Sequence, residues 1–129
     1  MNELRDSGVD PLIIDAGDLF FSTANLNSTN KKSELYRAGA ILEGYNRVGC
    51  DAINVGHYEV LNGLSFLKSM EEKTEIPFLS ANLRDSKTNK LLFEPFRIIE
   101  KGLLKIGIVG VTDKLPDTTK SMIADNYVE

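Results

Sequence analysis

The chain has 129 residues, of which 42% are hydrophobic and 26% charged, and its formal net charge is −4. These values are typical of one globular domain and indicate neither disorder nor a membrane partner, because no apolar run approaches the ~20 residues needed to cross a bilayer. The negative charge argues against a nucleic-acid polymer as a partner, since phosphate backbones are bound by clustered lysine and arginine. The single Cys50 has no partner for an internal disulfide, and we expect it to be a small buried residue.

The first predicted strand delivers two carboxylates to a turn. A short helix over residues 2–7 should end at Gly8, and Pro11 prevents it from continuing. The apolar run 12–14 predicts a strand covered on both faces, and it ends in Asp15-Ala16-Gly17-Asp18. Asp15 and Asp18 are therefore candidate ligands of a divalent metal. The alternative is a turn in which Asp18 only accepts hydrogen bonds from local N–H groups.

A polar loop over residues 20–30 leads into the longest predicted helix, which Thr29 or Asn30 caps and which runs to about Val48. Apolar residues recur on one face of it at three- and four-residue spacing, so this face should pack on the sheet. They are Leu35, Ala38, Leu42 and Tyr45.

The second predicted strand covers residues 50–56 and is bracketed by glycines. Gly56 lets the backbone turn sharply, which places His57, Tyr58 and Glu59 at the carboxyl end of the strand, where open α/β sheets bind ligands. A strand, a turn and an acidic helix start without any site is the alternative. The next helix should run to about Lys73, with Val60, Leu64 and Leu67 on its buried face.

The third predicted strand, residues 76–81, ends at another polar residue, Asn82. We expect Asp18, His57 and Asn82 to converge at one edge of the sheet. From residue 91 the pattern changes to short apolar segments, 91–93, 96–99 and 104–109, which predict an antiparallel meander with a hairpin turn at Lys101-Gly102. The chain thus divides into strand–helix alternation (1–82), a β-meander (83–112) and a tail (113–129) with one short helix after Asp117.

Four motifs taken together resemble the calcineurin-like metallophosphatases, specifically the 5'-nucleotidase branch. They are residues 15–20 (DAGDLF), 49–59 (GCDAINVGHYE), 78–83 (FLSANL) and 105–112 (KIGIVGVT). The resemblance implies an α/β fold, a layered sandwich of mixed sheets with flanking helices, here incomplete at both ends. It also implies divalent metal ions (Mn, Zn, Mg or Ca) that activate water for phosphoester hydrolysis.

The resemblance also suggests roles for single residues. Asp18 matches the aspartate that bridges the two metals in this family. The family has Gly-Asn-His-Glu where this chain has Gly56-His57-Tyr58-Glu59, so His57 takes the position of a metal ligand. Tyr58 takes that of an imidazole, which it replaces only as the donor of one hydrogen bond. The candidate assignment is Asp18, His57 and Asp15 for metal, Tyr58 and Glu59 for catalysis, and Asn82 for substrate binding.

The resemblance implies that the longer parent protein hydrolyses phosphate monoesters such as nucleotides, while the 129-residue chain alone is inactive. The departures at His57 and Tyr58 motivate an alternative, a catalytically degenerate domain that binds or scaffolds. A doubly wound nucleotide-binding domain is disfavoured, because no Gly-x-Gly-x-x-Gly loop follows any strand. The chain shows no signal peptide, so its location stays unknown, although the family often works in the periplasm or outside the cell.

We also expect the isolated chain to self-associate. The strand at residues 12–14 should present an unpaired apolar edge, and such edges pair with other chains. Exchange of the 113–129 tail is a second route, since its Leu115, Met122, Ile123 and Val128 have no obvious place in the core.

Overall fold

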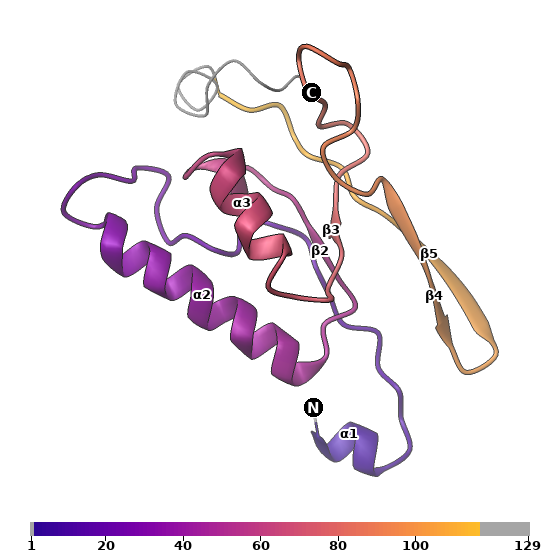
Figure 1. Cartoon of the computed structure of the whole chain (residues 1–129). Helices are drawn as coiled ribbons and strands as arrows, with labels where there is room; N and C mark the ends of the chain where they lie inside the picture. The colour runs from indigo at the N-terminus through magenta and orange to yellow at the C-terminus, as the bar shows by residue number, and fades with distance from the viewer. Residues whose placement is uncertain (1, 117–129) are drawn as a thin grey trace.

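The protein is described by a computed structural model that covers residues 2–116 (Figure 1). Its helices are α1 (Asn2–Asp6), α2 (Lys31–Val48), the 3₁₀ helix η1 (Tyr58–Val60) and α3 (Leu64–Glu71). Its strands are β1 (Ile14–Asp15), β2 (Ala52–Asn54), β3 (Phe78–Leu79), β4 (Phe96–Lys101) and β5 (Leu104–Val109). Helices α2 and α3 lie to one side of a three-stranded sheet, and a β4–β5 hairpin lies to the other. The predicted α/β class with mixed sheets is confirmed.

The three-stranded sheet is parallel, in the order β1-β2-β3. Ile14 pairs with Ala52, and Ile53 pairs with Phe78. Because all three strands run in the same direction, their carboxyl ends meet at one edge. The strands are shorter than predicted. At the entry to β1, the Ile13 N–H is bound by the Asp51 carboxylate (N–Oδ2 distance 2.8 Å) in place of a ladder partner.

The prediction that the first strand is covered on both faces is wrong for β1. Side chains alternate between the two faces of a strand. Ile13 packs against the core cluster, whereas Ile14 is 53% exposed. The apolar run correctly predicted a strand. Whether the second face of that strand is covered depends on elements far away in the sequence.

Helix α2 begins after Asn30 and ends at Gly49, which adopts a left-handed conformation (φ 72°). Ala38 and Leu42 are buried, as predicted.

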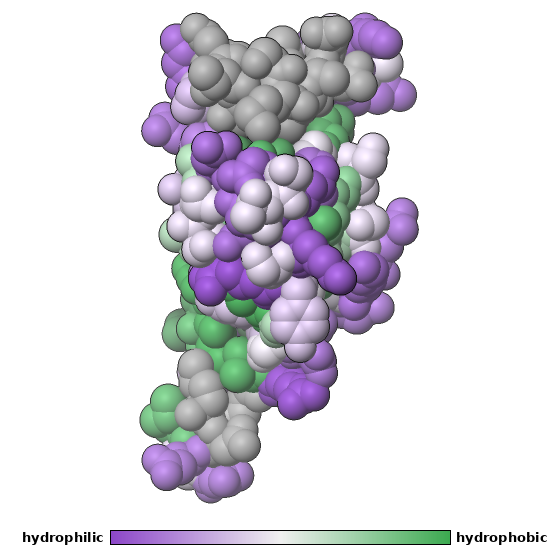
Figure 2. Space-filling model, turned by 90° about the vertical axis from the view of Figure 1, so that its left-hand side faces the viewer, coloured by the Kyte–Doolittle hydropathy of each residue, from purple (hydrophilic) through white to green (hydrophobic). Residues whose placement is uncertain are grey.

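The face of the molecule seen in Figure 2, the left-hand side of Figure 1, has mainly hydrophilic residues at its middle and hydrophobic ones gathered below them. The helix predicted after the second strand is split into η1 and α3, both of which keep their apolar residues, Val60 and Leu67, buried.

Of the predicted meander, only the hairpin is present in the described residues. Strands β4 and β5 pair from Phe96–Val109 to Lys101–Leu104, and Gly102 at the turn has a positive φ of 58°. Residues 91–93 contribute one isolated bridge, between Arg84 and Leu91, and no strand. The side chain of Lys101 ties the hairpin to the sheet through Asp51 (3.0 Å) and Asp10 (3.1 Å).

After β5 the chain crosses the end of β3. A Cβ atom on Gly110 would lie 2.4 Å from the Leu79 carbonyl oxygen, so this approach requires glycine. The expectation that Leu115 has no place in the core is wrong, because Leu115 is fully buried in the core cluster. The predicted helix after Asp117, with Met122, Ile123 and Val128, lies outside the described residues. Among residues 2–116, no helix has the length and apolarity to cross a membrane.

Candidate functional site at the carboxyl edge of the parallel sheet

Glu59 joins the loops that follow β1 and β2. Its side chain is fully buried, and its carboxylate accepts four backbone N–H groups. Oε2 receives those of Asp18 (2.8 Å) and Gly56 (2.8 Å), and Oε1 receives those of Leu19 (2.6 Å) and Phe20 (3.2 Å). Burial raises the pKa of this carboxyl group, and the four N–H groups oppose that shift. This geometry describes a positioning role, so the catalytic role assigned to Glu59 stays a prediction.

Two glycines allow these loops to touch. A Cβ atom on Gly17 (φ 99°) would lie 2.9 Å from the Gly56 nitrogen, and one on Gly56 would lie 2.7 Å from the Asp18 nitrogen. Asp18 itself has a positive φ of 58°, which aspartate tolerates better than most residues. The contact turns Asp18 toward the β2 loop, where its Oδ1 accepts the Tyr58 backbone N–H (2.8 Å).

Asp18 and His57 line one cavity of about 310 Å³ at this edge of the sheet. The cavity wall also includes residues that the sequence did not single out, among them Asn54, Asp113 and Lys114. The side-chain ring of Tyr58 lies edge-on to that of His57, with the ring centroids 5.5 Å apart. The predicted convergence of Asp18 and His57 is therefore present. Asn82, the third member of that prediction, is not among the residues that line this cavity.

Asn82 is bound to the segment that follows β5. Its Nδ2 donates to the Thr112 carbonyl (2.7 Å), and its Oδ1 accepts the Thr112 N–H (2.8 Å). Thr112 is buried, and its hydroxyl donates to the Val55 carbonyl (2.6 Å) and lies 2.8 Å from the Ser80 hydroxyl. Asn82 therefore fixes residues 111–113 against the ends of β2 and β3, and its predicted contact with substrate stays a prediction.

Asp15 lies apart from this cavity. Its Oδ1 accepts the Gly17 N–H (2.8 Å), and its Oδ2 accepts the Tyr45 hydroxyl (2.9 Å) from α2. Burial and the Asp15 carboxylate raise the pKa of Tyr45 to about 12. One carboxylate oxygen supports the turn after β1 and the other holds β1 to α2, so the metal-binding role assigned to Asp15 stays a prediction.

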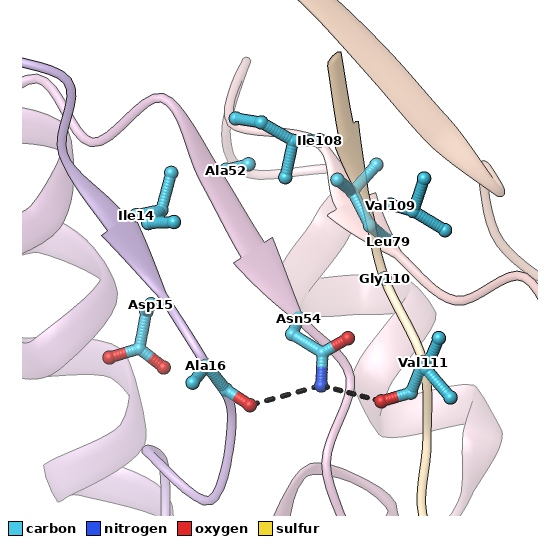
Figure 3. A pocket seen from close by; sticks show the side chains of 10 residues that line it. All are labelled: Ile14, Asp15, Ala16, Ala52, Asn54, Leu79, Ile108, Val109, Gly110 and Val111. Atoms are coloured by element: carbon cyan, nitrogen blue, oxygen red, sulfur yellow. Dashed lines mark hydrogen bonds between the residues drawn. The ribbon is translucent and has the colours of Figure 1, made fainter. Parts of the chain in front are cut away.

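Asn54 stands between this cavity and a second hollow, about 350 Å³, on the hairpin side of the sheet (Figure 3). Its Nδ2 bridges the carbonyls of Ala16 (3.0 Å) and Val111 (3.0 Å). Its Oδ1 is buried without a hydrogen-bond partner in the described part of the chain. Mostly apolar residues line the second hollow, including Ile14, Leu79 and Ile108.

The donors at the cavity suit a divalent metal in kind but not in number. Asp18 brings a carboxylate and His57 an imidazole to the cavity, and carboxylate oxygen and imidazole nitrogen are ordinary metal ligands. However, within residues 2–116 no three His, Cys, Asp or Glu side chains lie close enough to hold a metal ion. The described residues therefore do not complete a metal centre.

Sequence reasoning missed Asp113, Lys114 and the network around Thr112. Each comes to the site because Gly110 lets the chain cross β3. A glycine directly after an apolar strand was the available signal.

Curated relatives at the sequence level are 5'-nucleotidases. The 5'-nucleotidase of Vibrio cholerae is 36% identical over 102 residues, which are 79% of this chain and 18% of that protein. Protein UshA of Salmonella pullorum is 36% identical over 104 residues, 81% of this chain and 18% of the relative. This chain belongs to the 5'-nucleotidase family. It spans about a fifth of the length of these relatives, and no family model matches it.

Solved structures of the same family share the fold. The 5'-nucleotidase precursor from Thermus thermophilus has a TM-score of 0.61 and 25% identity, covering 86% of this chain and 21% of its own. The NAD nucleotidase of Haemophilus influenzae has a TM-score of 0.61 and 27% identity, with the same coverage. The calcineurin-like phosphoesterase YfkN of Bacillus subtilis, at 23% identity and a TM-score of 0.64, supports the fold alone.

Proposed function

We propose that this chain forms part of a metal-dependent phosphoesterase that hydrolyses phosphate monoesters, nucleotides among them. The supporting observation is the pair of loops locked together by Glu59, which brings Asp18 and His57 to one cavity in a chain 36% identical to a 5'-nucleotidase. Asp18 and His57 would supply two metal ligands, and further ligands would come from beyond the described residues. Divalent metals in such enzymes stabilise charge on the phosphoryl oxygens and activate water.

The test uses the complete protein that carries this chain. We expect it to release phosphate from nucleoside 5'-monophosphates with added Mn²⁺ or Zn²⁺, and to lose this activity with a chelator. Asp18→Asn should reduce turnover roughly 100-fold or more, because an amide is a poorer ligand than a carboxylate. Asp6→Asn, on the exposed surface of α1, is the matched control and should behave as wild type. Turnover that persists in Asp18→Asn would contradict the assignment.

A second candidate is a catalytically degenerate domain that binds a nucleotide without hydrolysing it. The observation in its favour is that His57 stands where the family has asparagine, and Tyr58 stands where it has histidine. A phenol carries no positive charge, so Tyr58 does not replace a protonated imidazole. Nucleotide binding by calorimetry without turnover in any of the four metals Mn, Zn, Mg and Ca would favour this candidate.

Two further proposals follow from the family. The 129-residue chain alone should show no phosphatase activity, because its described residues do not complete a metal centre. The complete protein should work in the periplasm or outside the cell, which cell fractionation checks.

A further inference from the structure

A basic residue, Lys114, lines the cavity at the sheet edge, and the resemblance to the family did not point to it. Two acidic residues, Asp18 and Asp113, line this cavity together with His57 and the basic residue Lys114. A phosphate monoester is an anion, and binding it beside two carboxylates requires positive charge. The divalent metals of the proposed function would supply part of that charge. Tyr58 supplies none, because a phenol is neutral, whereas Lys114 brings a cationic side chain to the residues that line the cavity.

Lys114 follows a segment that hydrogen bonds hold against the ends of β2 and β3. Thr112, two residues earlier, is fixed by both amide atoms of Asn82 (2.7 and 2.8 Å) and by its own bond to the Val55 carbonyl (2.6 Å). Asn54 holds the Val111 carbonyl (3.0 Å). The Lys114 backbone N–H then donates to the Asp113 carboxylate (2.7 Å). The backbone leading to Lys114 is thus anchored to the ends of β2 and β3, which reduces the entropy cost of using its side chain for binding.

The ammonium group of Lys114 is not consumed by a structural ion pair within residues 2–116. Lys68, Lys101 and Lys105 each pair with a carboxylate there, whereas Lys114 takes part in none of the six ion pairs. The lysine side chain has a compact positive charge at the end of a flexible stem, which suits it to binding phosphate.

We propose that Lys114 binds the phosphate group of the substrate in this cavity, in a role that nothing in the Gly56-His57-Tyr58-Glu59 motif fills. The inference rests on the proposed phosphoesterase function for its substrate, but the binding of an anion is measurable without turnover.

The experiment compares Lys114→Gln, Lys114→Arg and Lys105→Gln in the complete protein. Inorganic phosphate is the probe in calorimetry, and KM and kcat for a nucleoside monophosphate are the second readout. Because a charge-assisted hydrogen bond is lost, Lys114→Gln should weaken phosphate binding roughly 10-fold or more and raise KM more than it lowers kcat. Lys114→Arg keeps the charge and should retain most of the affinity. Lys105, on the exposed hairpin and paired with Glu100, controls for general loss of charge, and its variant should bind phosphate as wild type does.

The outcomes separate this inference from the proposed function. If the wild type hydrolyses nucleotides and Lys114→Gln changes neither KM nor phosphate affinity, the inference is wrong and the function stands. If the wild type binds phosphate through Lys114 but hydrolyses no ester, the function is wrong and the inference stands. A wild type that binds no phosphate overturns the inference, and equal losses in Lys114→Gln and Lys105→Gln would overturn it as well.

Discussion

The residue that holds the site together is Glu59, because its two oxygens serve four backbone donors from two loops. Glu59→Gln replaces one oxygen by an NH₂ group, which would face two N–H donors and leave them unpaired. We expect a loss of about 3 kcal/mol in the free energy of unfolding, measured by urea denaturation. Glu43→Gln, whose carboxylate is an exposed partner of Arg47 on α2, should change it by less than about 0.5 kcal/mol. Equal effects of the two variants would contradict the positioning role.

A second prediction for a single residue concerns the Tyr45–Asp15 pair. The pKa of Tyr45 is raised from 10.0 to about 12 in the folded protein, so the folded state retains a proton that the unfolded state loses. Stability from this group is complete below pH 10 and is lost as the pH rises toward 12. Tyr45→Phe should remove the step near pH 12 from an ultraviolet titration of tyrosinate. Tyr36→Phe removes a phenol that is 81% exposed, and should leave the step near pH 12 in place.

At the scale of the secondary-structure elements, the close approach of Gly110, just after β5, to the end of β3 determines whether residues 111–114 reach the site. Gly110→Ala would bring a Cβ atom within 2.4 Å of the Leu79 carbonyl oxygen, and one of the two segments must then move. We expect a loss of about 3 kcal/mol in stability. Gly107→Ala lies within β5, three residues before Gly110, with nothing within 4 Å of the added Cβ, and should be nearly neutral. Thermal unfolding of the two variants side by side provides the comparison.

The order of elements was predictable from the sequence, because apolar periodicity and glycine stops depend on local residues. The helix ending at Gly49 and the turn at Gly102 are such cases. The exposure of Ile14 was not, since it depends on what lies across the sheet. Asp18 and His57 were predictable as neighbours because parallel strand ends meet. The commitment of Asn82 to Thr112 was not, because 30 residues separate them and no local pattern marks the pair.

For the whole molecule, the open prediction is self-association of the 129-residue chain. β1 is an edge strand of the parallel sheet, and its Ile14 is 53% exposed. The hairpin also has exposed apolar residues, which include Phe96 (50%), Ile98 (60%) and Val109 (64%), and Val109 lines the same hollow as Ile14. An exposed edge with apolar side chains pairs with another chain unless charge or a covering element blocks it.

The measurement is sedimentation of the chain at micromolar concentration, where we expect a dimer or a larger species. Ile14→Lys places a charge on the edge strand and should shift the equilibrium toward monomer. Tyr36→Lys changes an exposed residue on α2 and should leave the equilibrium unchanged. The burial of Leu115 in the core of its own chain removes one of the residues that tail exchange would have used, so edge pairing is the route we expect. A monomer at every concentration, or equal effects of the two lysine variants, would contradict this prediction.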